Sequence, residues 1–233
     1  MRILLVRTAC WLVQHERILI VGSAVIFVLA AGTFSLVKLA AHGYNALDLA
    51  IFAQVIDKTA HGQLFGFGIH PHLYFGDHID ISLLLFVPFW KLLPYAGTLL
   101  ILQTVILAFG IWPLWLLAKE RRPLFRLGIV WVYLGTVLVH NIAAFEFHTL
   151  SLIVPLLLTA AFGYAQRRFR LFALALLATL LVREDMGLVV AGFGLLALVE
   201  RRSWRWSIPF LVFGTGWFFA GIYLTGIFNN DHY

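Results

Sequence analysis

Charged and sulfur-containing side chains are scarce in this sequence. Asp, Glu, Lys and Arg make up 12% of its 233 residues, which is roughly half the share found in soluble domains. Cysteine occurs once, as Cys10, so the chain cannot close an internal disulfide. So few charges cannot cover a surface that faces water. The composition therefore excludes a soluble enzyme, a disordered chain and a disulfide scaffold.

Apolar residues are abundant, at 62% of the chain, and they occur in long continuous runs. A membrane-spanning helix needs about 20 such residues. The runs predict an all-α integral membrane protein with about seven transmembrane helices in one domain, residues 1–233. Residues 18–40 form the first span, and 41–96 form an outer loop with amphipathic and re-entrant helices. Residues 97–228 hold the remaining spans.

Two features of the hydropathy pattern shape this topology. The apolar run 81–93 covers only about 20 Å of a roughly 30 Å membrane core as a helix, so we expect a re-entrant or interfacial helix there. The triplet Arg183-Glu184-Asp185 interrupts a long run between two short apolar segments. We expect it to form a turn recessed below the outer surface. The alternatives are a full span at 81–93, one long helix through the triplet, and a triplet salt bridge without chemistry.

Basic residues lie in short clusters between the apolar runs, as in the cytoplasmic loops of membrane proteins. They predict a multi-pass protein of the cell membrane with a cytoplasmic N-terminus, and they argue against a nucleic-acid partner. In this topology most of the 17 Lys and Arg residues lie inside: Arg2, Arg7, Arg17, Lys119, Arg121, Arg122, Arg126, Arg167, Arg168, Arg170, Arg201, Arg202 and Arg205.

Most acidic residues and histidines fall on the opposite, outer side of this topology. Acidic residues have little influence on membrane insertion, so their segregation needs another cause. It indicates a polar site that faces outside the cell. The alternative is that the outer loops are simply longer than the inner ones.

The outer loop begins with a predicted helix. Asn45 is typical of a helix start, and the residues after it show helical periodicity. On a helical wheel Asp48 falls within the apolar arc, whereas Gln54 and Asp57 fall on the opposite arc. A carboxylate on an apolar face is costly unless it has a partner or a function. Asp48 is therefore a candidate functional residue, with helix capping as the alternative, and Asp57 is expected to be a solvated charge.

Farther along the loop, His70-Pro71-His72 and the segment 76–80 are rich in metal-ligand residue types. Their spacing matches no zinc motif. Oxygen-rich ligation of a divalent cation, Mg²⁺ or Mn²⁺, is compatible with Asp77 and His78. The alternative is a polar loop with structural histidine hydrogen bonds.

Short motifs follow one another in order along the chain: Leu47-Asp48-Leu49-Ala50-Ile51-Phe52-Ala53-Gln54, Gly62, Gly76-Asp77-His78, Phe147-His148 and Glu184-Asp185. With them the sequence resembles a family of prokaryotic multi-pass membrane proteins of unknown function, which is similar to the GT-C superfamily of lipid-linked glycosyltransferases. Members of the family are typically much longer, so the resemblance covers their N-terminal half. The chain departs from the pattern in having Leu47 before the acid and no proline after Asp80.

The resemblance implies a GT-C-like fold and a glycosyltransferase that takes a sugar from a polyprenyl-phosphate carrier to an acceptor at the extracytoplasmic face, with membrane lipid and this donor as partners. Asp48 would activate or orient the acceptor hydroxyl, and His78 and His148 would hold phosphate or assist proton transfer. The implied substrate-binding residues are Arg183 on the carrier phosphate, Glu184 and Asp185 orienting Arg183 or binding a metal, and also Glu146 and Gln54. The rival functions are a transporter or lipid flippase and a non-catalytic scaffold.

Overall fold

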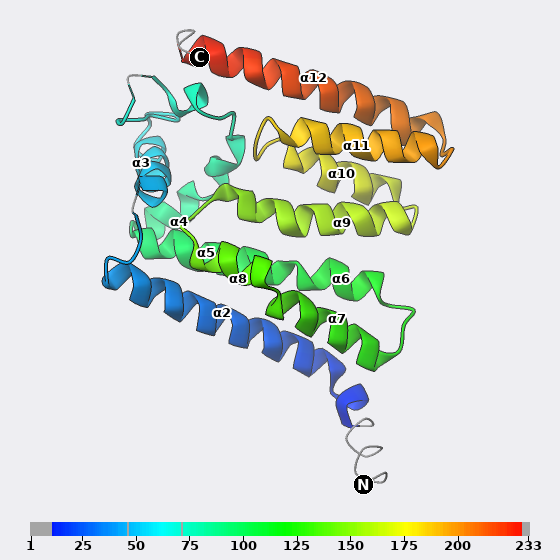
Figure 1. Cartoon of the computed structure of the whole chain (residues 1–233). Coiled ribbons are helices and arrows are strands. Elements are labelled where there is room, and N and C mark those ends of the chain that lie inside the picture. Colours follow the sequence, from blue (N-terminus) through cyan, green and yellow to red (C-terminus); the bar gives the residue numbers. More distant parts are fainter. Residues whose placement is uncertain (1–10, 46, 71, 230–233) are drawn as a thin grey trace.

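The chain folds into a bundle of helices in the computed structural model, which describes residues 11–45, 47–70 and 72–229 (Figure 1). Asn45, the expected helix cap, adjoins a residue outside the described part. The described elements, all helical, are α2 (Glu16–Ala40), α3 (Leu47–Ala60), η1 (Tyr74–Gly76), η2 (Ile81–Leu85), α4 (Val87–Leu92), α5 (Ala96–Phe109), α6 (Ile111–Leu117), α7 (Pro123–Gly135), α8 (Val137–Ala144), η3 (Thr149–Leu152), α9 (Ile153–Ala165), α10 (Phe169–Thr179), α11 (Met186–Val199) and α12 (Trp204–Phe228).

Three helical segments in the described part are long and apolar enough to cross a membrane: α2, the continuous pair α5–α6 and α12. The pair α7–α8 is a fourth candidate, bent by 43° at Thr136. The seven-span expectation and its GT-C-like arrangement are not confirmed, because α9, α10 and α11 are shorter than a full span. Breaks that a hydropathy profile does not reveal, such as the bend at Thr136 between α7 and α8, divide the apolar runs into short helices.

The helices lie side by side in layers, from α2 at one edge to α12 at the other (Figure 1). The connections α6–α7, α9–α10 and α11–α12, which carry the basic clusters, meet at one end of the bundle together with the start of α2. The other end carries α3, the loop after it, α4 and the turn between α10 and α11. The basic clusters and the candidate site residues therefore occupy opposite ends.

Residues 81–93 form no spanning helix. They fold into η2 and α4, whose Leu83, Phe86 and Trp90 are buried in one apolar cluster with α3. The backbone N–H of Ser82 donates to the carbonyl of Leu181, at 2.8 Å, in the turn between α10 and α11. This short segment thus joins the α3 region to that turn, where residues 180–185 rule out a single helix through the triplet.

Helices α11 and α12 pack backbone to backbone. A Cβ atom added to Gly214 on α12 would lie 2.5 Å from the backbone N of Ala191 and from the carbonyl oxygen of Gly187, both on α11. Small residues of this kind let membrane helices approach closely. The contact fixes the long α12 alongside α11 and the turn that precedes it.

Candidate functional site

A polar cavity of about 370 Å³ opens at the end of the bundle that carries α3. Helix α3, the loop after it, the start of η3 and the turn after α10 all contribute to its wall. The lining residues are Asp48, Ile51, Phe52, His70, Tyr74, Asp77, His78, Asp80, His148, Thr149, Leu150 and Arg183. The structure thus brings four segments, distant in sequence, to one site.

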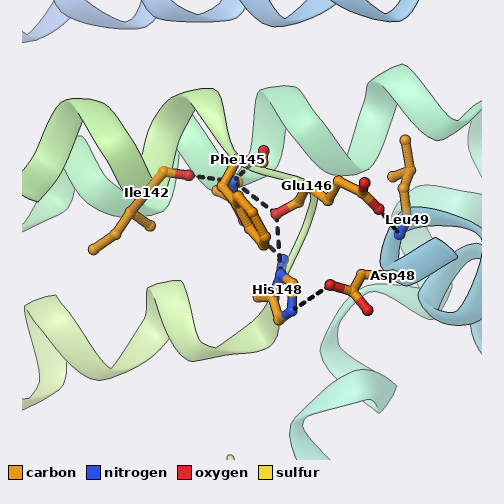
Figure 2. A network of polar contacts seen from close by, with 7 residues as sticks. Asp48, Leu49, Ile142, Phe145, Glu146 and His148 are labelled. Atoms are coloured by element: carbon orange, nitrogen blue, oxygen red, sulfur yellow. Dashed lines mark hydrogen bonds and ion pairs between the residues drawn. The ribbon is translucent and has the colours of Figure 1, made fainter. Parts of the chain in front are cut away.

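Asp48 and His148 form an ion pair in this cavity, with 3.5 Å between Asp48 Oδ2 and His148 Nε2 (Figure 2). The other ring nitrogen, Nδ1, lies 3.1 Å from the carbonyl oxygen of Glu146. A carbonyl oxygen only accepts, so Nδ1 carries a proton. Nε2 then faces the Asp48 carboxylate, so both ring nitrogens of His148 point at acceptors.

The Glu146 side chain does not line the polar cavity but binds the backbone next to Asp48. It is buried, and its Oε2 accepts from the backbone N–H of Leu49 at 2.8 Å (Figure 2). Backbone N–H groups in the first turn of a helix have no partner within it, so the Glu146 carboxylate stabilises the start of α3. The sequence predicted that Glu146 binds substrate. In the structure its carboxylate accepts a hydrogen bond from the backbone N–H of Leu49.

His78 is held by Glu184. Glu184 Oε1 lies 3.0 Å from His78 Nδ1, and Oε2 accepts from the backbone N–H of Ile79, also at 3.0 Å. Burial raises the pKa of Glu184, but the hydrogen bonds from His78 and the backbone outweigh it and hold that pKa below its usual range. The sequence predicted that Glu184 orients Arg183 or binds a metal. In the structure its carboxylate bonds to His78 and to the backbone N–H of Ile79.

Arg183 has Asp185 beside it, with 3.2 Å between Nε and Oδ2. This separation fits an ion pair, yet the Nε–H does not point at an acceptor and makes no hydrogen bond to the described residues. The guanidinium also lines the cavity. Most of its five donors therefore remain available to a ligand, so the triplet salt bridge does not satisfy Arg183.

The two remaining sequence predictions concern Gln54 and the metal. The Gln54 amide does not line the cavity but packs against Gly68, and its Oε1 is buried without a hydrogen bond. Asp77 Oδ1 lies 3.7 Å from His72 Nε2. In the described part of the chain no three His, Cys, Asp or Glu side chains gather as they would around a metal ion. The described donors around Asp77 and His78 therefore form no divalent-cation site.

Asp80 is a site residue that sequence reasoning did not single out. It is only 2% exposed, and it accepts from Ser82 Oγ at 2.6 Å and from Thr149 Oγ1 at 2.5 Å. Burial raises the pKa of its carboxyl to about 6, despite these hydrogen bonds. Its position just before an apolar run was the available signal. His70, from the histidine-rich segment His70-Pro71-His72, joins it in the cavity wall. Tyr74 and Thr149 do so too, and nothing in the sequence distinguished these two.

The raised pKa of Asp80 makes the stability of the protein depend on pH. From the usual 3.8 the pKa rises to about 6, so ionisation is less favourable in the folded chain than in the unfolded one. The contribution of Asp80 to the free energy of unfolding is fully present at pH values below the pKa of Asp80 in the unfolded chain. It is lost as the pH rises through the pKa of Asp80 in the folded chain. Asp80→Asn removes this dependence.

We expect the melting temperature of the wild type to fall by about 5 °C more than that of Asp80→Asn when the pH is raised from about 4 to about 8. Thermal unfolding in detergent at both pH values measures it. Parallel changes in the two proteins would show that Asp80 does not titrate in this window.

No curated protein and no solved structure matches this chain. A protein family described as "Predicted membrane protein (DUF2079)" matches residues 38–230. The matched segment runs from the end of α2 through α12 and contains every residue of the cavity. Because the match covers most of its length, the chain belongs to this DUF2079 family of predicted membrane proteins.

Proposed function

We propose that the protein is a membrane glycosyltransferase, which moves a sugar from a polyprenyl-phosphate carrier to an acceptor at the extracytoplasmic face. One observation carries the proposal: a guanidinium with available donors, three aspartates and three histidines line a single cavity at one end of a membrane bundle. Charged groups placed among membrane helices are rare and usually functional. The GT-C-like position of the acid soon after the first span adds support.

Each charged group has a chemical role in this proposal. The planar fork of Arg183 suits the phosphate of the carrier, which it can bind through two parallel hydrogen bonds. Positive charge develops on the sugar ring as the bond to phosphate breaks. The Asp48 carboxylate stabilises that charge and orients the acceptor hydroxyl. His148, paired with Asp48, donates to phosphate when substrate is bound.

We propose that the cavity opens on the extracytoplasmic face of the cell membrane and that the N-terminus lies in the cytoplasm. The support is the separation of the basic clusters from the cavity at opposite ends of the bundle, together with the enrichment of Lys and Arg in cytoplasmic loops.

Labelling of single cysteines, on a background without Cys10, tests this orientation. A membrane-impermeant thiol reagent added outside intact cells should label a cysteine at position 77 and leave cysteines at positions 122 and 168 unlabelled until the cells are opened. Labelling of 122 and 168 but not of 77 would place the cavity on the cytoplasmic face and overturn the arrangement.

The proposed activity is tested with purified protein in liposomes that contain a set of polyprenyl-phosphate sugars. We expect the protein to release sugar from at least one carrier to an added hydroxyl acceptor. Movement of the lipid across the bilayer without loss of sugar would instead identify a flippase. The absence of both sugar loss and lipid movement, with every donor, would favour the scaffold.

A further inference from the structure

We infer that His78 is the residue that removes the acceptor proton, and that Glu184 is the positioning residue that holds its imidazole in the required tautomer. This inference rests on the proposed glycosyl transfer and assigns one of its steps. It gives Glu184 a partner and a role different from those expected from the sequence.

The hydrogen bonds of Glu184 fix which nitrogen of His78 carries the proton. Both carboxylate oxygens are in use, one toward His78 Nδ1 and one toward the backbone N–H of Ile79. An ionised carboxylate only accepts, so the proton of the neutral ring lies on Nδ1. Nε2 is then an unprotonated acceptor, and it makes no hydrogen bond to any described residue. Because the ring lines the cavity and its side chain is 39% exposed, Nε2 is accessible to substrate.

His148, another histidine of the cavity, cannot perform this step in the same way. Both nitrogens of His148 face acceptors, the carbonyl of Glu146 and the carboxylate of Asp48. Its Nε2 is therefore directed at a carboxylate, whereas Nε2 of His78 makes no hydrogen bond to a described residue. Of His78 and His148, His78 is therefore the one whose Nε2 is placed to accept a proton.

Glu184 is itself fixed from three sides. It lies in the turn just before α11, it accepts a hydrogen bond from the backbone of Ile79, and α12 packs against it at Gly221. A Cβ added to Gly221 would lie 2.2 Å from the Cβ of Glu184, so the absence of a side chain there makes room for the glutamate. A carboxylate immobilised in this way orients an imidazole as the acidic member of a catalytic triad does.

The step balances as follows. The acceptor hydroxyl oxygen forms a bond to the anomeric carbon of the sugar while its proton moves to Nε2 of His78. The bond between the anomeric carbon and the phosphate oxygen breaks, and its electron pair stays on phosphate. Polyprenyl phosphate leaves with one more negative charge. His78 then gives the proton to water, and no oxidant or reductant is needed.

Steady-state kinetics of three variants test the assignment. We expect Glu184→Gln to lower kcat about 10–100-fold with little change in KM for the lipid donor, because Glu184 does not line the cavity. His78→Ala leaves the Glu184–Ile79 hydrogen bond in place, and added imidazole should restore part of its activity. The matched control is Glu200→Gln at the opposite end of α11, which should behave as the wild type.

A rise in KM at unchanged kcat for Glu184→Gln, or His78→Ala that imidazole does not rescue, would overturn the role of His78. A readout independent of activity is the ¹⁵N spectrum of labelled histidine, with His78→Gln identifying the His78 signals. We expect a protonated Nδ1 and a bare Nε2, and the other tautomer would contradict the inference. An inactive wild type with the expected tautomer would reject glycosyl transfer and the proton-transfer step, but not the Glu184–His78 pairing.

Discussion

Asp48→Asn should lower the rate of sugar transfer about 10²–10³-fold, the usual loss when one preorganised electrostatic group is removed from an active site. Asparagine keeps the size of aspartate and can still hydrogen-bond at the start of α3, so folding should survive. It loses the negative charge that pairs with His148 across 3.5 Å and that faces the cavity. Sugar loss from a polyprenyl-phosphate donor, followed in membranes, measures the effect.

Asp57→Asn is the matched control, since Asp57 lies in the same helix but outside the cavity. Its Oδ1 accepts from the indole N–H of Trp90 at 2.8 Å, and an asparagine oxygen can accept the same bond. We expect nearly full activity. Equal activity of Asp48→Asn and wild type would remove Asp48 from the mechanism. Equal damage from both substitutions would mean that the loss arises from the packing of α3.

Arg183→Lys should raise KM for the lipid donor about 10–100-fold, with a smaller effect on kcat. Lysine keeps the charge but lacks the planar fork that binds two phosphate oxygens at once. A hydrogen bond to a charged group contributes about 1.5–3 kcal/mol, and each 1.4 kcal/mol is a factor of about ten in affinity. Donor-concentration curves in liposomes measure the change.

The control for Arg183 is Arg170→Lys, an exposed arginine in the first turn of α10, at the basic end of the bundle. It should leave KM unchanged. An unaltered KM in Arg183→Lys would show that the guanidinium does not bind the donor phosphate. A fall in kcat alone would point to a role for Arg183 in the transition state instead.

Local patterns in the sequence predicted the elements well where one segment decides the outcome. The apolar runs around α2 and α12 became single helices, and the charged triplet at 183–185 became a turn because two short apolar segments flank it. The phase of α3 placed Asp48 and Asp57 on different sides, as the cavity and the Trp90 contact show. Asp57 is nevertheless not the purely solvated charge that its phase suggested.

Partners from distant segments could not be predicted in the same way. Glu184 and His78 are 106 positions apart, and no periodicity in one sequence relates them. Gln103 lies in an apolar run that simply predicts a span, yet the structure buries it, with its amide nitrogen donating to Ile142 O and its oxygen accepting from the backbone N–H of His148. Such contacts depend on how the helices pack, which hydropathy does not encode.

The short lengths of α10 and α11 make the protein sensitive to bilayer thickness. With 11 and 14 residues, these helices reach only about 17 and 21 Å, whereas a typical hydrocarbon core is about 30 Å thick. The bilayer beside them must thin, or water must enter above the turn that carries Arg183 and Glu184. Longer acyl chains raise the cost of that deformation, so we expect the lipid composition of the membrane to influence how readily water reaches the cavity.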